Sequence, residues 1–330
     1  MNTIIIITLS VILNIIIYLF HEKLIKILNV YDLPNIKRKK HNKKTSLLGG
    51  LIILINCYFI FFIDKFFFNN LFTNFNINSF IIGCSLIFLL GLYDDKYDVN
   101  ANLKFILQIL IVSLIILIDD NLIVNTLNIS SNNSTLGLGK ASFIFSVICI
   151  VIFINALNMY DGINLQVGIY SIGIFFALIF YSIEHLFLIS LIISLLVFLH
   201  LNHKSKVFLG DNGSNLLGFI ISFLIIYTAN NYESSNLSIE NIFILMMLPG
   251  LELIRLFVLR LKKRRHPFSA DRNHIHHLIV DQEGYLKSIL ITKFYFISPI
   301  ILMIIFEDFL QFIISAYVIL YIYIIKKYEK

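Results

Sequence analysis

Long apolar runs recur along almost the whole chain, and their length constrains the fold more than any other feature. Most of them approach the roughly 17–25 apolar residues that cross a ~30 Å hydrocarbon core as a helix. Eleven segments can be drawn, at residues 4–20, 47–63, 77–93, 103–118, 141–157, 167–181, 186–201, 215–228, 241–261, 289–306 and 309–325. Only 14% of the residues are charged, and the mean hydropathy is +0.86. The sequence therefore predicts an all-α, polytopic membrane protein with about 11 transmembrane helices, forming a single integral-membrane domain over residues 1–330.

The distribution of Lys and Arg predicts how the chain is oriented. The first apolar segment lacks a basic stretch before it and a small-residue cleavage site after it, so we interpret it as a retained helix rather than a signal peptide. If the loop after this segment is cytoplasmic, twenty-three of the 26 Lys and Arg residues lie on the cytoplasmic side. This asymmetry places the N-terminus outside and the C-terminus in the cytoplasm. The net charge of +6 then reflects membrane topology, and no nucleic-acid partner is predicted.

With this orientation, every stretch rich in Asp, Asn, His or Gly falls on the cytoplasmic face. Such one-sided polar chemistry favours an enzyme with a water-soluble substrate in the cytoplasm. A transporter would more often carry charges near the bilayer midplane and show an internal repeat. The single cysteines Cys57, Cys84 and Cys149 lack metal or disulfide spacing, and we interpret them as packing residues.

The stretch "GLYDDKYDVNANLK" places Asp94, Asp95 and Asp98 just after the third apolar segment. Neighbouring carboxylates repel one another unless a cation offsets them, and they suit Mg²⁺, which prefers oxygen ligands and commonly bridges phosphates. One of them could serve as a general base. A solvated acidic turn at a helix end has the same appearance, and isoprenoid enzymes also use DDxxD to hold magnesium diphosphate.

Two further stretches carry polar groups suited to a sugar nucleotide. In "NALNMYDGIN", the spacing of three puts Asn155, Asn158 and Asp161 on one helical face, where amides and a carboxylate could bind a nucleobase or sugar. In "VFLGDNGSNLLGF", glycines bracket Asp211 before a helix N-terminus, which suits a metal ligand beside a phosphate. The alternatives are polar residues that satisfy helix ends and an ordinary Asp/Gly turn.

The stretch "YDLPNIKRKKHNKKTSLLGGL" contains a basic run that ends at His41. Most of its lysines could simply anchor the chain to anionic lipids. The more specific interpretation is a basic funnel for a phosphorylated lipid, with His41 among its donors.

The stretch "HPFSADRNHIHHL" contains Arg272, His274, His276 and His277. A zinc site would need a second Cys/His cluster, which the chain lacks, and the remaining histidines form no diiron-type box. Neighbouring arginines favour an anion site in which imidazole and guanidinium donors bind a diphosphate. A structural loop is the remaining interpretation. In the preceding apolar segment, Glu252 and Arg255 are predicted to form a structural ion pair that supports this loop.

Taken together, in order and spacing, these five stretches resemble the polyprenyl-phosphate N-acetylhexosamine-1-phosphate transferase family, glycosyltransferase family 4. The resemblance runs from about Asp32 to Leu278, and the form "PFSADRNHIHHL" is similar to the GlcNAc-1-phosphate transferase branch. It implies transfer of an N-acetylhexosamine 1-phosphate from a UDP-sugar to undecaprenyl phosphate with Mg²⁺, or Mn²⁺ in its place, in the bacterial cytoplasmic membrane. The products would be a lipid-diphospho-sugar, which initiates a cell-envelope glycan, and UMP.

The resemblance also implies roles for individual residues. Asp94 and Asp95 match the catalytic aspartate pair, and Asp211 matches the Mg²⁺ ligand. The nucleotide-pocket residues are matched by Asn158 and Asp161, the aromatic near the uracil by Phe208, and the phosphate-binding histidine motif by His274, His276 and His277.

Several positions depart from the family pattern. Asn164 and Leu165 stand where a further Asp and Gly are common, and Ser46 stands where Pro is usual. The change at Asn164 leaves the identity of the sugar open, and the sequence does not define the downstream polymer or the oligomeric state, for which a homodimer is one option. The alternatives are a phospho-N-acetylmuramoyl-pentapeptide transferase, a DDxxD prenyltransferase, a transporter and a family member without activity.

Overall fold

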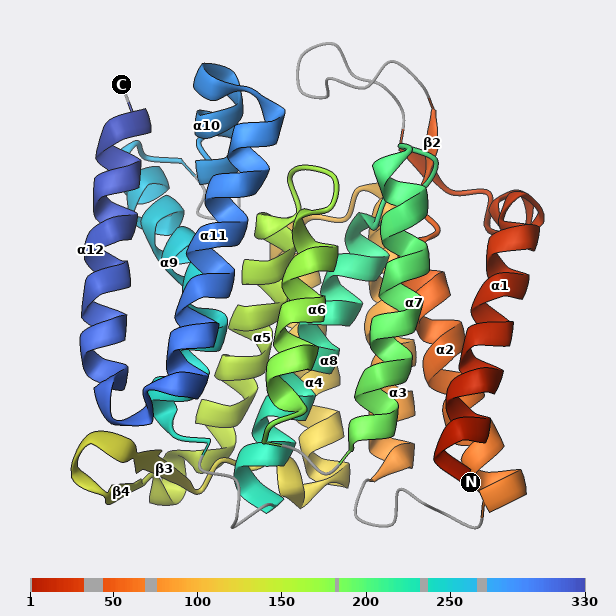
Figure 1. Ribbon diagram of the computed structural model, residues 1–330, viewed down its shortest axis with the longest axis horizontal. Helices are drawn as coiled ribbons and strands as arrows, with labels where there is room; N and C mark the ends of the chain where they lie inside the picture. Colours follow the sequence, from red (N-terminus) through yellow and green to blue (C-terminus); the bar gives the residue numbers. More distant parts are fainter. Residues whose placement is uncertain are drawn as a thin grey trace.

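The computed structural model describes residues 2–32, 44–68, 76–181, 184–231, 237–265 and 272–329. Most of the helices in these residues run side by side along one direction and form a bundle (Figure 1). Helix α1 begins at one end of the bundle and α12 ends at the other (Figure 1). The predicted orientation, with the N-terminus outside and the C-terminus in the cytoplasm, stays a prediction.

Each of the eleven predicted apolar segments forms a helix, and the described residues contain twelve α-helices in all. The helices are α1 (Asn2–Leu28), α2 (Gly49–Ile63), α3 (Ile77–Tyr97), α4 (Ala101–Ile118), α5 (Ser142–Tyr160), α6 (Gln166–Leu178), α7 (His185–His203), α8 (Gly210–Asn231), α9 (Ile239–Lys262), α10 (Ile275–Glu283), α11 (Tyr285–Ile305) and α12 (Leu310–Tyr328). Within the described residues, ten are long and apolar enough to cross a membrane, while α6 has only 13 residues. The prediction of an all-α polytopic membrane protein is confirmed. The additional helix, α10, is short and carries two of the predicted histidines.

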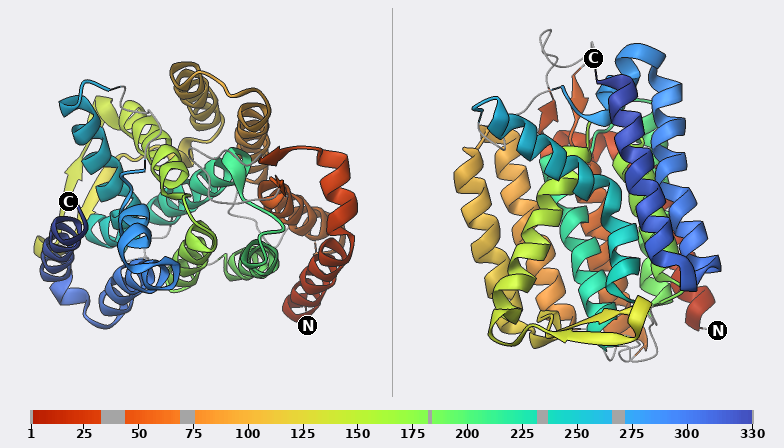
Figure 2. Two further views of the ribbon diagram at one scale, coloured as in Figure 1. Left: turned by 90° about the horizontal axis from the view of Figure 1, so that it is seen from above. Right: turned by 90° about the vertical axis from the view of Figure 1, so that its left-hand side faces the viewer.

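Helix α8 is the centre of the bundle, and 94% of its most apolar 18-residue window is buried (Figure 2). Small residues let its neighbours approach closely. A Cβ atom added at Gly218 would lie 2.7 Å from the Cα atom of Ile154 in α5, and one at Gly91 in α3 would lie 2.5 Å from the Cα atom of Asn212. A larger side chain at either position would separate the helices. The backbone at the start of α8 is therefore held tightly between α3 and α5.

Helix α1 lies at the edge of the bundle and exposes isoleucines and leucines along one side (Figure 2). Its buried side carries polar residues that bond to neighbouring helices. Asn14 and Asn56 in α2 exchange amide hydrogen bonds of 2.7 and 3.3 Å, and Ser10 lies 3.0 Å from Ser190 in α7. Such interhelical bonds compensate for the absence of a hydrophobic driving force within lipid.

Two small antiparallel sheets were not predicted from the sequence. Strands β1 (Tyr31–Asp32) and β2 (Thr45–Ser46) pair at the end of the bundle near α10, and β3 (Thr126–Ile129) and β4 (Ser134–Gly137) form a hairpin at the other end (Figure 1). The carbonyl of Ser46 accepts a hydrogen bond of 2.8 Å from the Phe208 amide. Because Phe208 precedes α8, this bond brings the segment that contains Asp32 beside the start of the central helix.

Candidate active site

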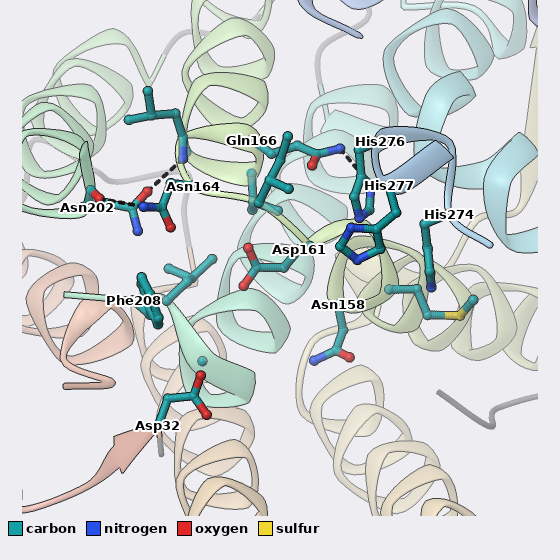
Figure 3. Close-up of a pocket in the computed structure, with 18 of the residues that line it drawn as sticks. Asp32, Asn158, Asp161, Asn164, Gln166, Asn202, Phe208, His274, His276 and His277 are labelled. Atoms are coloured by element: carbon teal, nitrogen blue, oxygen red, sulfur yellow. Dashed lines mark hydrogen bonds between the residues drawn. The ribbon is translucent and has the colours of Figure 1, made fainter. Parts of the chain in front are cut away.

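A pocket of about 850 Å³ opens at the end of α3, among the loops that follow α5 and α7, and at the start of α10. All five predicted stretches contribute to its lining, through Asp32, Asp95, Asp161, Asp211 and His276. Figure 3 shows Asp32, Asp161 and His276 around this pocket. Residues more than 240 positions apart in the chain therefore meet in one place. The basic run that includes His41 lies outside the described residues.

Lys104, at the fourth residue of α4, joins two of the predicted carboxylates. Its Nζ atom donates to Asp94 at 2.7 Å and to Asp211 at 2.5 Å. The Lys104 and Asp94 side chains are only 12% and 9% exposed, whereas the Asp211 side chain is 35% exposed. Sequence reasoning counted Lys104 only as a positive charge at the membrane surface. Its position at the start of an otherwise apolar helix, ten residues after Asp94, was the available signal.

Asp94 and Asp95 are neighbours, yet they have different surroundings. Asp94 accepts a 2.7 Å hydrogen bond from the Val99 amide in addition to Lys104, and it is not part of the pocket lining. Asp95 lines the pocket and accepts 2.9 Å bonds from the amides of Asp211 and Asn212 and a 2.6 Å bond from the Asn212 side chain. It thus caps the N-terminus of α8, where a negative charge is favoured.

Asp211 lies in the first turn of α8, where the positive φ of +71° at Gly210 starts the helix. Its second carboxylate oxygen accepts a 2.7 Å hydrogen bond from Asn158, which also donates to Ser214 at 2.9 Å. Asn158 therefore holds Asp211 in place and lines the pocket. Asn155, one turn earlier on α5, is not part of the lining, because its amide donates to Gln108 and to the Val151 carbonyl. The spacing predicted that both amides would bind the substrate, but only the Asn158 side chain lines the pocket.

Asp161 projects into the pocket, which Phe208 also lines (Figure 3). Burial raises the pKa of Asp161 to about 7, and the negative charges of Asp211 and Asp95 add to this shift. The carboxyl group therefore keeps its proton to a higher pH than an ordinary aspartate does. It could donate as well as accept a hydrogen bond from a nucleotide.

A turn after Asp161 contains Asn164 and Leu165, two of the residues that depart from the family pattern. Leu165 has a left-handed backbone with φ of +67°, which is typical of glycine. Asn202 accepts a 2.6 Å hydrogen bond from the Leu165 amide (Figure 3). Asn164 donates to the Asn202 carbonyl and to Ser205, at 3.1 and 3.0 Å. These bonds hold the turn in the conformation that glycine would adopt more easily.

Replacing Leu165 by glycine is expected to stabilise the protein. A left-handed non-glycine residue costs about 1–2 kcal/mol, and the extra freedom of glycine in the unfolded chain offsets about 0.5–1 kcal/mol of the gain. We expect the midpoint of thermal unfolding in detergent to rise by about 1–2 °C. Leu196→Gly, in the middle of α7, is the matched control and should lower it. Equal losses for both variants would contradict the prediction.

The histidine loop places three imidazole rings together. The ring centroid of His276 lies 5.3 Å from that of His274 and 4.3 Å from that of His277 (Figure 3). Among the described residues, no group of three or more His, Cys, Asp or Glu side chains could hold a metal ion. Arg272 lines the pocket and donates to Asp281 in α10 at 3.1 Å. The rings and this guanidinium come from α10 and the residues just before it, whereas Asp95 in the same lining comes from α3.

Glu252 in α9 anchors this loop. It is 1% exposed and accepts 2.7 Å and 2.6 Å hydrogen bonds from Arg255 and Tyr321. It also accepts a 2.8 Å bond from the Ile275 amide, at the start of α10. Arg255 in turn donates to the Asn273 carbonyl at 2.5 Å. The predicted ion pair that supports the loop is present, and it also reaches α12 through Tyr321.

Known proteins similar to this chain share most of this region. Residues 77–229 match the family described as Glycosyl transferase family 4. The undecaprenyl-phosphate alpha-N-acetylglucosaminyl 1-phosphate transferase of Salmonella typhi is 26% identical over 278 residues, covering 81% of this chain and 73% of that protein. The protein of the same name from Escherichia coli strain K12 is 26% identical over 79% of this chain and 72% of its own length. The probable undecaprenyl-phosphate N-acetylglucosaminyl 1-phosphate transferase of Bacillus subtilis strain 168 is 29% identical over 76% of this chain and 69% of its own.

Proposed function

We propose that the chain is a member of glycosyl transferase family 4, whose model matches residues 77–229, and that it transfers an N-acetylhexosamine 1-phosphate from a UDP-sugar to undecaprenyl phosphate and releases UMP. The family match covers the carboxylates of α3 and α8 and the Asn158–Asp161 segment. The observation that carries the proposal is the junction of Asp94, Lys104 and Asp211 beside a pocket that also contains Asp161 and the histidines. The expected sugar is of the GlcNAc type, and the product would initiate synthesis of an O-antigen, a teichoic acid or a capsule.

The donor set suits Mg²⁺, with Mn²⁺ as an alternative. Asp94 and Asp211 already share one cation, the Lys104 ammonium, so their oxygens attract positive charge at this place. Mg²⁺ usually takes one or two carboxylates, with phosphate oxygens and waters completing its shell, so a cluster of three protein ligands is not required. Asp211, the more exposed of the two, would hold the ion. Bound there, the ion would neutralise diphosphate charge and stabilise departing UMP.

The contacts of the residues in the site suggest which role each of them has in the transfer reaction. In phosphoryl transfer, positioning and charge neutralisation contribute more than covalent chemistry by the protein. Lys104 supplies a buried positive charge next to Asp94. In the proposed reaction, Asp94 orients or deprotonates the lipid phosphate, and this phosphate attacks the β-phosphorus of the UDP-sugar directly. Asp95 already accepts three hydrogen bonds from the start of α8, which suits a supporting role rather than a nucleophilic one. The histidines and Arg272, which line the same pocket, would bind the diphosphate.

The proposal also includes the membrane setting. We place the pocket on the cytoplasmic side of the bacterial cytoplasmic membrane, because the Lys and Arg residues concentrate at that end and UDP-sugars are water-soluble. The acceptor would then reach the carboxylates from the bilayer.

An assay with purified protein in lipid nanodiscs tests the function. Undecaprenyl phosphate, Mg²⁺ and each of several UDP-N-acetylhexosamines are supplied, and UMP release is measured. We expect release with at least one sugar, and a loss of about 100-fold or more in Asp211→Asn. Asp308→Asn is the matched control, because Asp308 is exposed at the link between α11 and α12. The absence of UMP with every sugar would overturn the function, and unchanged release by Asp211→Asn would overturn the site.

A further inference from the structure

His276 differs from the other two histidines of the loop because its ring is completely enclosed. The residue is 0% exposed, and its backbone carbonyl accepts a 3.0 Å hydrogen bond from Ser288 in α11. A Cβ atom added at Gly162 would lie only 1.8 Å from His276 Nε2, so this edge of the ring packs directly on the glycine backbone. Gly162 and His276 both line the pocket. The position and orientation of the imidazole are therefore fixed.

Gln166, the first residue of α6, bonds to the other ring nitrogen. Its amide nitrogen lies 3.2 Å from His276 Nδ1 (Figure 3). With the Gln166 amide in this orientation, its nitrogen donates, so Nδ1 accepts and carries no proton. The proton of a neutral imidazole then resides on Nε2. Gln166 is itself 0% exposed, and its backbone carbonyl accepts a 2.6 Å hydrogen bond from Lys293 in α11, which holds the residue in place.

The surroundings of His276 also oppose a second proton. Burial lowers the pKa of His276 well below its usual value, and the charges of neighbouring cationic groups lower it further. Among the described residues, the cationic groups and rings around His276 are Tyr160, Arg255, His274, His277 and Lys293. Of the carboxylates close by, Glu252 is paired with Arg255 and bonded to the Ile275 amide, and Asp161 precedes Gly162 with its own pKa raised by burial.

Among the described side chains, His276 Nε2 is a buried polar atom without a hydrogen-bond partner. We propose that Gln166 is a positioning residue that keeps His276 as a neutral Nε2–H donor at the pocket wall beside Gly162. Because this edge of the ring packs on Gly162, an oxygen acceptor of the bound substrate reaches Nε2 only when the contact with Gly162 opens. The identity of that substrate rests on the proposed function. The fixed tautomer does not, because it follows from contacts within the chain. His276 thus differs from His274 and His277 because the hydrogen bond from Gln166 fixes the tautomer of its ring.

Nitrogen NMR of the protein with ¹⁵N-labelled histidine in lipid nanodiscs tests the tautomer without any substrate. The His276 signals are identified by their loss in His276→Asn, or by their shift in Gln166→Glu if the first variant does not fold. We expect a protonated Nε2 and a bare Nδ1 at every pH between about 5.5 and 8, a range in which an ordinary histidine titrates. A proton on Nδ1 in the unaltered protein, or an ordinary titration of this ring, overturns the proposal.

Gln166→Glu tests the consequence for activity. The carboxylate would accept from Nδ1–H, so the neutral ring would have a bare Nε2 and only the imidazolium could still donate there. UMP release by this variant, relative to the unaltered protein, should therefore fall by about 10-fold or more as the pH rises through the pKa of the paired imidazole. Gln311→Glu, on the exposed side of α12, is the matched control and should change neither readout.

The two measurements separate the two proposals. If no UDP-sugar yields UMP but the His276 signals show a protonated Nε2, the proposed function fails and the role of Gln166 is supported. If UMP is released and the pH profiles of Gln166→Glu and the unaltered protein superimpose, the function is supported and the role of Gln166 is overturned.

Discussion

Lys104→Met should lower UMP release by about 100- to 1,000-fold, the range found when one preorganised electrostatic donor is removed from an active site. The substitution keeps a long apolar stem but removes the charge that joins Asp94 to Asp211. Two carboxylates would then face each other without the cation between them, and their repulsion would favour protonation or rotation of one side chain. Either change removes the arrangement on which binding of a phosphate and a divalent cation would depend.

The matched control for this prediction is Lys96→Met. Lys96 lies two residues after Asp94, is exposed, and contacts the ring of Tyr97 rather than a carboxylate. Both variants remove one positive charge from the same end of the bundle, so a general effect on membrane potential or lipid charge would reduce both activities. We expect the Lys96 variant to stay within about threefold of the unaltered rate, because isolated surface charges contribute little. Comparable rates for the two variants would show that Lys104 has no special role.

The helices could be predicted because their signal lies within each segment. An apolar run of the right length must form its backbone hydrogen bonds internally when it crosses lipid, so composition alone locates it. Helix α6 shows the limit of this reasoning, since its apolar run resembles the others although the helix has only 13 residues. Helix α10 was not predicted, because nine residues with two histidines lack the apolar periodicity of a packed helix.

The residues of the site were predicted better than their contacts. The order of motifs placed Asp95, Asp161, Asp211 and the histidines in one region, and they line one pocket. Whether a side chain reaches that pocket depends on the rotation of its helix against its neighbours, and spacing within one helix does not report this. Asn155 and Asn158 share a face, yet one bonds to Gln108 in α4 and the other to Asp211 in α8. Lys104 was missed for the same reason, because its partners lie in two other helices.

The pocket is therefore built by contacts between helices, and its two sides are supported differently. On the carboxylate side, α8 is clamped by close backbone contacts with α3 and α5, and Asp95 caps its first turn. On the histidine side, the described support includes a set of buried side chains that connect α9 and α12 to the start of α10, in addition to the contacts of His276 with Gln166 and Ser288. A substitution in that set should disturb the histidines while leaving the carboxylates in place.

Glu252→Leu is expected to have the largest effect on stability, at about 3–5 kcal/mol of unfolding free energy, as is found when one partner of a buried ion pair is removed. The substitution would leave the Arg255 guanidinium, whose side chain is 12% exposed, with only its longer 3.7 Å ion pair to the exposed Glu329. It would also remove the acceptor of the Ile275 amide and of the Tyr321 hydroxyl. Glu252→Gln should cost less, since its amide oxygen can still accept from Ile275.

The measurement is chemical unfolding in detergent, combined with hydrogen exchange of the amides in α10. We expect exchange to accelerate in residues 275–283 well before the rest of the bundle, because Glu252 is the acceptor that ties the first turn of this helix to α9. The matched control is Glu283→Gln, which breaks the exposed pair with Lys287 and should cost less than about 1 kcal/mol. If Glu252→Leu is no more destabilising than this control, the ion pair does not support the loop. If stability falls while exchange in α10 is unchanged, Glu252 stabilises α9 and α12 without holding the histidines.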